Sequence, residues 1–196
     1  QVLSKHPQVM VISDEIYEHI TYGGKHESIA QFPEVREQVV IVNGVSKAYA
    51  MTGWRMGYLC APKPMAKQIY KIHQYGIMCA PTTAQFAAVE AMRSGDEDVA
   101  YMTAEYNRRR THLVKRLREI GIQCFTPEGA FYVFPSIKST GLTSEEFCTR
   151  MIREGKVAAV PGACFGAEGY LRLSYCYSDE DLKEGLDRVE KFIKTL

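Results

Sequence analysis

The stretch SKAYAMTGWRMGY, residues 46–58, places a lysine and an arginine in a segment of small residues between two apolar runs. The runs VVIV, residues 39–42, and GYLCA, residues 57–61, have the composition of short buried strands. We therefore expect Lys47 and Arg55 to lie at or near the ends of buried strands. Because a buried cation requires a partner, this stretch predicts a site for something negatively charged.

The composition is that of an ordinary globular protein, with 46% hydrophobic and 24% charged residues among 196. The 24 Lys and Arg residues balance 23 Asp and Glu residues, and no basic stripe alternates with aromatic residues. No apolar run approaches the ~18 residues of a membrane span, and residues 1–10 lack the pattern of a signal peptide. We therefore expect neither a nucleic-acid nor a membrane partner.

Six cysteines lie far apart in the sequence, without the C-x-x-C spacing of zinc or redox sites. We interpret them as reduced core thiols of a cytoplasmic protein and expect no metal site. The sequence does not begin with Met and reaches strand-like residues almost at once, so we expect it to be a piece of a longer chain.

The first half of the chain has the pattern of an α/β layer, in which short apolar runs alternate with polar or helical stretches. The segment SGDED, residues 94–98, combines turn and capping residues, and we place a domain boundary there. The resulting domains are residues 1–95 and 96–196. Strands are predicted in the first domain at 9–12, 39–42 and 57–61, and helices at 67–73 and 83–92.

The second domain is predicted to be a compact α+β unit that opens with a long helix at 99–120. Gly121 is a plausible C-terminal cap of this helix, and the triple arginine at 108–110 is interpreted as its solvated surface. Further strands are expected at 122–125, 130–135, 156–160 and 170–175, and further helices at 143–155 and 178–196.

Both of the later helices open with a hydroxyl residue three positions before an acid, a spacing that caps a helix N-terminus. The pairs are Thr143 with Glu146 and Ser178 with Asp181. In the last helix, apolar residues recur at helical intervals and predict one buried face. That face is expected to contain Leu182, Leu186, Val189 and Ile193.

Asp14 and Tyr17 follow the first predicted strand in VISDEIYEHITYGG, residues 11–24. A carboxylate just past the carboxyl end of a strand lies where open α/β sheets usually bind ligands. Taken alone, Asp14 could also be a helix cap or turn acid, and Tyr17 an amphipathic core residue. Glu15 is interpreted as a surface charge or a supporting charge behind the site, because neighbouring side chains of an extended segment point in opposite directions.

Four short motifs occur along the chain: D-E-I-Y at 14–17, S-K at 46–47, G-W-R-M-G at 53–57 and R-L-S-Y at 172–175. In this order and spacing they resemble the fold-type I pyridoxal-phosphate enzymes, specifically the class I and II aminotransferases of the aspartate and aromatic aminotransferase kind. The resemblance covers essentially the whole chain but only the C-terminal half of the family's pattern. It implies an incomplete, mainly parallel large domain that binds the cofactor, followed by a small α+β domain.

The resemblance assigns roles to the residues of the first domain. Lys47 would form the Schiff base with pyridoxal phosphate and shuttle a proton during the reaction. Asp14 would pair with the pyridine nitrogen of the cofactor, and Tyr17 would donate to the phenolate oxygen of its ring. Arg55 would hold the phosphate with its planar fork of donors.

The resemblance also assigns Arg172, in the segment YLRLSY, to the α-carboxylate of the substrate. In an alternating strand, Leu171 and Leu173 are expected to face away from Arg172. Some relatives carry a phosphate-binding serine three residues before the lysine. Here that position is Gly44, which leaves only a backbone N–H, and Ser46 is the candidate substitute.

Two further segments resemble parts of the family near the substrate entrance and the edge of the small domain. They are GAFYVFP at 129–135 and PGACFG at 161–166. For both, an interpretation as turns and core aromatics is at least as well supported.

The function implied is that of an aminotransferase, a homodimer that moves an amino group between an L-amino acid and a 2-oxo acid. The family's N-terminal half is missing, and with it the loop that cradles the phosphate. We therefore expect the piece alone to be inactive and either poorly stable or paired with another chain. Two alternatives stay open: a carbon–sulfur lyase or decarboxylase on the same scaffold, and the aminotransferase-like sensing domain of a transcription regulator.

Overall fold

The computed structural model describes all residues from Gln1 to Leu196, which form two compact units, Gln1–Met102 and Thr103–Leu196. The strands are β1 (Val11–Asp14), β2 (Val39–Gly44), β3 (Gly57–Cys60), β4 (Tyr132–Val133), β5 (Val160–Pro161) and β6 (Leu171–Ser174). The α-helices are α1 (Lys63–Gly76), α2 (Thr82–Ser94), α3 (Asp96–Glu119), α4 (Ser144–Arg150) and α5 (Asp179–Ile193). Shorter helical turns are η1 (Leu3–Lys5), η2 (Ile29–Gln31), η3 (Pro33–Gln38), η4 (Thr52–Trp54), η5 (Lys138–Thr140), the π-helical η6 (Met151–Gly155) and η7 (Gly162–Phe165).

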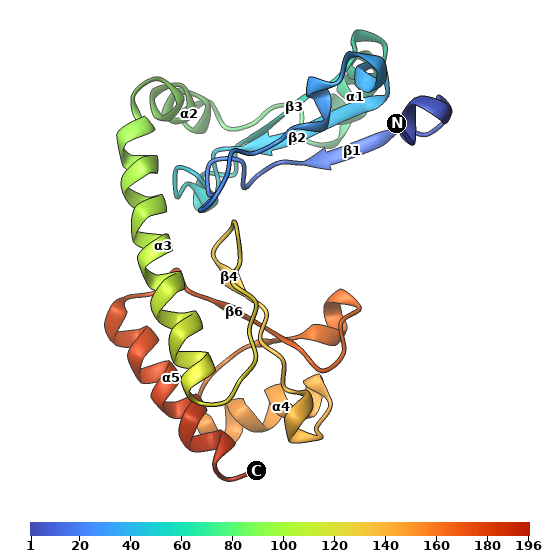
Figure 1. Ribbon diagram of the computed structural model, residues 1–196. Coiled ribbons are helices and arrows are strands. Elements are labelled where there is room, and N and C mark those ends of the chain that lie inside the picture. The colour runs from blue at the N-terminus through green and yellow to red at the C-terminus, as the bar shows by residue number, and fades with distance from the viewer. The chain divides into compact units, whose positions relative to one another are not determined.

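The first unit contains a three-stranded sheet in which β2 lies between β1 and β3 (Figure 1). β1 runs parallel to β2, with Asp14 opposite Val42, and β3 runs antiparallel to β2, with Gly57 opposite Gly44. The sheet is therefore mixed, and the expectation of a mainly parallel sheet holds only for the first pair. β3 returns antiparallel to β2 after a connection, residues 45–56, that contains the short turn η4 and no α-helix.

The helices of the first unit lie where the sequence predicts them, with longer bounds. α1 and α2 include the predicted helices 67–73 and 83–92. The predicted break at 94–98 is shorter than expected, because Asp96 already begins α3 and only Gly95 separates the two helices. The division between the two units falls inside α3, seven residues after the sequence-based boundary at 95. The assignment of residues 1–95 and 96–196 to two domains stays a prediction.

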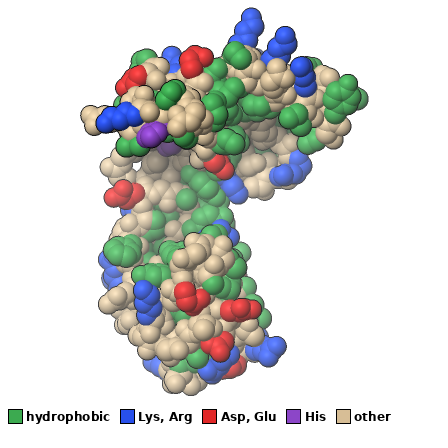
Figure 2. Space-filling model, turned by 90° about the vertical axis from the view of Figure 1, so that its right-hand side faces the viewer, with side chains coloured by type: hydrophobic (Ala, Val, Ile, Leu, Met, Phe, Trp, Pro, Cys, Tyr) green, Lys and Arg blue, Asp and Glu red, His purple; other side chains and the backbone are tan.

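Apolar side chains are exposed at several places on the face of the first unit that Figure 2 shows. α1 has no buried residue, and Tyr75 and Ile72 on it are 89% and 76% exposed. Ile12 on β1 is 75% exposed, although its neighbours in the strand are partly covered. Part of the core of this unit is a cluster in which Val45, Met51 and Ala88 are buried together, where the connection after β2 packs against α2. The sheet and helix of this unit therefore leave apolar faces that other protein surfaces could bury.

The second unit contains a small antiparallel sheet in the order β4-β6-β5. Its strands are shorter than the sequence predicts, and the strand expected at 122–125 does not form. Ile122 and Cys124 are buried, as the alternating pattern predicts. The segment nevertheless forms only one backbone hydrogen bond of the kind that joins strands, from the Ser136 N–H to the Gln123 carbonyl. Likewise only Val160 of the predicted strand 156–160 pairs with β6. Alternating burial alone therefore does not make a strand when the backbone lacks a partner.

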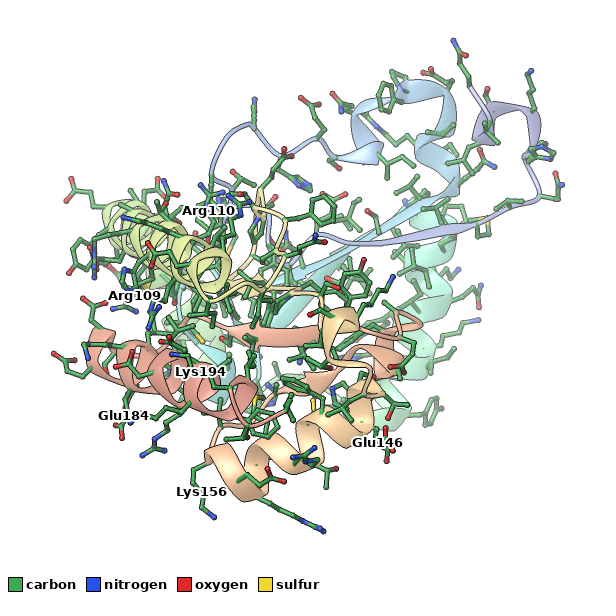
Figure 3. All side chains as sticks on the ribbon, turned by 60° about the horizontal axis from the view of Figure 1, so that its bottom comes forward. Arg109, Arg110, Glu146, Lys156, Glu184 and Lys194 are labelled. Atoms are coloured by element: carbon green, nitrogen blue, oxygen red, sulfur yellow. The ribbon has the colours of Figure 1, made fainter.

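The helices of the second unit confirm most of the predicted capping. Thr143 and Glu146 form a complete capping box at the start of α4. Figure 3 labels Glu146 on this helix. At α5, Ser178 accepts from the Asp181 N–H, but the Asp181 carboxylate accepts from the Ser178 hydroxyl rather than from its backbone. Gly121 has φ +86° and ends α3 as predicted. The buried residues of α5 are Leu182, Leu186, Val189 and Phe192, so Phe192 replaces the predicted Ile193.

α5 lies beside the part of α3 that belongs to the second unit, and charged side chains join the two helices (Figure 1). Arg108 contacts Asp179 at 2.7 Å, and Arg116 contacts Asp187 at 3.4 Å. Arg109, labelled in Figure 3, and Arg110 are partly buried rather than solvated. The interpretation of residues 108–110 as solvated surface is therefore wrong for two of the three, because this face of α3 is covered by α5 and by the segment that follows α3.

The cysteines form no disulfide, and only Cys124 and Cys148 are buried. The other four are exposed, so the interpretation of all six as core thiols is wrong. Burial raises the pKa of the Cys148 thiol to about 11. No group of His, Cys, Asp and Glu side chains has the arrangement of a metal site, and no helix is long and apolar enough to cross a membrane.

Candidate active site

The segments that carry the predicted cofactor residues meet at one edge of the first unit's sheet. β1 and β2 are parallel and end at this edge with Asp14 and Gly44. β3 is antiparallel and starts at the same edge with Gly57. Lys47 and Arg55 lie on the connection from β2 to β3, so the sheet topology brings their backbones to the edge that Asp14 occupies.

Gly44 is required for the close approach of β2 and β3. A Cβ atom at Gly44 would lie 2.9 Å from the Gly57 Cα and 2.9 Å from the Met56 carbonyl oxygen. The Gly44 N–H donates to the side-chain oxygen of Asn43 at 2.7 Å. The one donor that Gly44 offers in place of a serine hydroxyl is therefore already used within the chain. Steric crowding between the strands excludes any larger residue, serine included, at this position.

Lys47 lies close to Tyr17, as the predicted site requires. The Lys47 Nζ is 5.9 Å from the centre of the Tyr17 ring, within the range of a cation–π contact. Both side chains are partly buried, and the backbone carbonyl of Lys47 accepts from Ala50 N–H at 3.3 Å. The structure thus brings an amine and a phenol together from two segments thirty residues apart in sequence.

Arg55 has a strained backbone and an exposed side chain. Its φ of +54° and ψ of +47° place it in the left-handed region, directly after η4. Its Nη1 donates to the Thr52 carbonyl at 2.7 Å, and it forms no ion pair within the chain. The expectation of a buried cation at this position is therefore wrong, because β3 is exposed along its whole length. A residue keeps such a strained backbone only where the contacts around it stabilise that conformation, and such residues are common at ligand sites.

Asp14 and Ser46 are the two remaining predicted residues at this edge. The Asp14 Oδ1 accepts from the Ile16 N–H at 3.2 Å, which is the turn interaction that the sequence analysis left open as an alternative. Its side chain is otherwise exposed, so its second oxygen is accessible to a ligand. Ser46 is partly buried next to Lys47.

Glu15 is buried, and the sequence analysis did not predict the polar cluster that surrounds it. Only 5% of its surface is exposed. Its carboxylate accepts from the Ser13 hydroxyl at 3.0 Å and the Ser28 hydroxyl at 2.9 Å, and it pairs with His26 Nε2 at 3.0 Å. Burial alone would raise the pKa of Glu15, but the hydrogen bonds from these three side chains outweigh it and lower the pKa.

Of the two interpretations of Glu15, the surface charge is wrong, and the supporting charge behind the site agrees with its burial. Its carboxylate ties the segment after β1 to residues 26–28, and this tie stabilises the turn that carries Asp14 and Tyr17. No sequence pattern predicts it, because the partners His26 and Ser28 are more than ten residues away.

Replacing Glu15 with Gln is expected to reduce the free energy of unfolding near neutral pH by about 1–3 kcal/mol, because buried donors lose a charged acceptor. The folded-state pKa of Glu15 lies below its ordinary value of 4.5, so its contribution is fully present above that pH and is lost as the pH falls through the lowered pKa. Denaturant unfolding from about pH 7 down to about pH 3 measures both effects. The exposed Glu34→Gln is the matched control, and equal stability of Glu15→Gln and the original chain at every pH would contradict the role.

Arg172 belongs to the second unit, on β6. Leu171 and Leu173 are buried on the opposite face of the strand, as the alternation predicts. The Arg172 guanidinium carbon lies 4.5 Å from the centre of the Tyr132 ring and 4.7 Å from that of Phe165. It forms no hydrogen bond or ion pair with another residue, so its N–H groups are accessible to a ligand.

Known proteins with similar sequences and structures are aminotransferases. Residues 1–189 match the family model described as aminotransferase class I and II. The chain is 49% identical over 192 residues to a putative aminotransferase, YugH, of Bacillus subtilis, covering 97% of this chain and 50% of that protein. It is 47% identical over 191 residues to an aspartate aminotransferase of Pyrococcus abyssi, covering 95% of this chain and 49% of that protein.

The structural comparison agrees with the sequence comparison. The aromatic aminotransferase of Pyrococcus horikoshii has a TM-score of 0.94 at 42% identity, over 99% of this chain and 53% of that one. An aspartate aminotransferase of Thermotoga maritima has a TM-score of 0.90 at 38% identity, over 98% of this chain and 50% of that one. The chain spans about half the length of the curated relatives it matches. Its sequence and its α/β fold together show that the chain belongs to the class I and II aminotransferase family.

Proposed function

We propose that the polypeptide to which this chain belongs is an aminotransferase that moves an amino group between an L-amino acid and a 2-oxo acid, with pyridoxal phosphate as its cofactor. The observation that carries the proposal is the meeting of Asp14, Lys47 and Arg55 at one sheet edge, with the Lys47 amine beside the Tyr17 ring. Membership of a family that depends on pyridoxal phosphate supports it.

The chemistry of these side chains fits this cofactor. The edge offers a carboxylate with one accessible oxygen, an amine beside a phenol, and a guanidinium that has no carboxylate partner. Pyridoxal phosphate presents matching groups: a ring nitrogen, an aldehyde, a phenolate oxygen and a phosphate. When bound, it supplies the electron sink that allows the substrate Cα to lose a proton.

Each residue of the first unit then has a distinct task. Lys47 attaches the cofactor and moves the proton at the substrate Cα. Asp14 supplies a fixed negative charge to the ring nitrogen, and Tyr17 donates from its hydroxyl to the ring oxygen. Arg55 holds the phosphate, and Ser46 is the candidate for an additional phosphate contact.

Arg172 has the remaining task, which is to bind the α-carboxylate shared by amino acids and 2-oxo acids. A guanidinium fork matches a carboxylate with two parallel hydrogen bonds. The relatives include proteins named for aspartate and for aromatic amino acids, so the proposal does not extend to the substrate side chain.

We further propose that residues 1–95 are part of the cofactor-binding domain and residues 96–196 the small domain of a homodimeric enzyme. The exposed apolar side chains of α1 and β1 support this, because they would be buried in a larger assembly. The chain by itself, at about half the length of its relatives, is expected to be inactive.

Borohydride reduction in the presence of pyridoxal phosphate is expected to attach the cofactor to Lys47. Reduction makes the bond between the lysine and the cofactor permanent, so peptide mass spectrometry identifies the labelled residue. The experiment uses a polypeptide extended to the full length of the relatives, with Lys47→Arg as the unlabelled control. Three exposed lysines could also react with the cofactor: Lys63, Lys67 and Lys71. Stoichiometric labelling of any of them in place of Lys47 would contradict the proposal.

A further inference from the structure

The guanidinium of Arg172 contacts two aromatic side chains that come from different segments. The distances from its Cζ to the ring centres are 4.5 Å for Tyr132 and 4.7 Å for Phe165. Both are within the ~6 Å that favours a cation–π contact. No Asp or Glu side chain of the chain forms an ion pair with Arg172, so the two rings contact a cation that keeps its charge available for a ligand.

The small sheet explains why these two rings flank Arg172. Tyr132 on β4 pairs with Ser174, two positions from Arg172 on β6, so Tyr132 is a diagonal neighbour on the same face. Aromatic and long side chains reach one another at this spacing. On the other side, β5 pairs Val160 with Arg172, and Phe165 lies in η7, directly after β5. The rings therefore approach β6 from its two neighbouring strands.

The turn that carries Phe165 is held by buried polar contacts. We call residues 162–169 the aromatic loop. Ser144, fully buried at the start of α4, accepts from the Ala163 N–H at 3.2 Å and donates to Glu168 at 3.0 Å. Gly162 has no space for a Cβ, which would lie 2.2 Å from a backbone oxygen of the same loop. These contacts define the position of Phe165 even though its ring is 48% exposed.

We infer that Tyr132 and Phe165 are positioning residues for Arg172, which orient its guanidinium so that the in-plane N–H groups face a carboxylate. This inference rests on the proposed function of Arg172. All N–H donors of arginine lie in the plane of the guanidinium, and the two rings lie within cation–π distance of its Cζ. Contacts with two rings restrict a long side chain that would otherwise lose freedom on binding.

If the two rings position Arg172, they affect the affinity for some ligands of the enzyme and not for others. An amino acid and its 2-oxo acid carry the same α-carboxylate, so the rings contribute equally to the affinity for both. They do not contribute to cofactor binding, since Arg172 does not bind the phosphate in the proposed site. Phe165 is the better position to test than Tyr132, because a half-exposed side chain can be replaced without unfolding the unit.

The first experiment observes the ring contact directly in the 196-residue chain, by NMR of the Arg172 side-chain Nε–H. The ring currents of two aromatic neighbours are expected to move this signal away from that of a solvent-exposed arginine. Phe165→Leu is expected to shift the signal towards the exposed value, and Phe165→Tyr to preserve it. Phe125→Leu, at a side chain 83% exposed in the same unit, is the control. An identical signal in the original chain and in Phe165→Leu would overturn the inference.

The second experiment measures kinetics in a polypeptide of the full length of the relatives. Phe165→Leu is expected to raise KM for the amino acid and for the 2-oxo acid by about three- to tenfold each, with kcat and cofactor affinity nearly unchanged. In an Arg172→Gln background the same substitution is expected to have no further effect on KM, because the cation is gone. An equal effect of Phe165→Leu in both backgrounds would show a general structural role and overturn the inference.

A failure of the proposed function is recognised separately. If Arg172→Gln by itself leaves both KM values unchanged, Arg172 does not bind the carboxylate, whatever the NMR signal shows. If Arg172→Gln raises both values and Phe165→Leu raises neither, the carboxylate role stands and the positioning role of the rings is refuted.

Discussion

Asp14→Asn, in a polypeptide of the full length of the relatives, is expected to bind pyridoxal phosphate but to lose at least about a hundredfold in transamination rate. The Asp14 carboxylate lies at the end of β1, where it can hold a fixed negative charge against the ring nitrogen of the cofactor. The neutral amide cannot keep that nitrogen protonated, so the transition state loses stabilisation while the phosphate contact is unaffected. The measurements are kcat with a saturating amino acid and the absorbance of the bound cofactor.

The fold offers a reason to choose Asn. In the original chain the Asp14 Oδ1 accepts from the Ile16 N–H, and the amide oxygen of Asn can accept the same hydrogen bond. The turn is therefore expected to survive, which separates loss of charge from loss of structure. Asp98→Asn, on the exposed first turn of α3, is the matched control. Near-normal turnover of Asp14→Asn would show that Asp14 is a turn residue only.

Arg55→Ala and Arg172→Ala are expected to weaken the binding of different ligands. Loss of one partner of a charge pair with a bound ligand costs about 2–5 kcal/mol. Arg55→Ala should weaken the binding of pyridoxal phosphate by this amount, because Arg55 is a cation at the sheet edge without an anion of its own. Arg172→Ala should weaken the binding of amino acids and 2-oxo acids by a similar amount and leave cofactor binding nearly unchanged.

Equilibrium dialysis of the cofactor and KM values for both substrate classes distinguish these two outcomes. Alanine at position 55 meets the same backbone strain as arginine at φ +54°, so Arg55→Ala should not add a folding defect. The exposed Arg93→Ala and Arg153→Ala are the control variants for the two units. If both test variants weakened cofactor and substrate binding equally, the division of tasks between Arg55 and Arg172 would be wrong.

The local features of the fold are those that the sequence predicts best. The capping box of Thr143 and Glu146, the left-handed Gly121 and the buried face of α5 each depend on residues a few positions apart. Interactions of this range are present in the sequence pattern itself, since a helix repeats every 3.6 residues. The order and spacing of the four motifs likewise led to the family that the comparisons confirm.

The strands show where sequence patterns stop being sufficient. Residues 122–125 have the alternation of a strand, and their side chains are buried accordingly, but no neighbouring backbone completes a ladder. β3 has an apolar sequence and yet is exposed along its length. A strand exists only through its partner, and partner choice depends on segments far away in the chain.

The amino-acid sequence alone was thus sufficient for the family and for the positions of the α-helices. The roles of the candidate residues Asp14, Lys47 and Arg172 stay predictions from the sequence. Tertiary structure decided which side chains surround them. Glu15 is buried because His26 and Ser28 return to it, and Arg172 meets the rings of Tyr132 and Phe165 because β4 and β5 flank β6. These contacts join residues on different elements, 7 to 40 positions apart. A helical or strand period relates residues only within one element, so the folded chain alone brings these residues together.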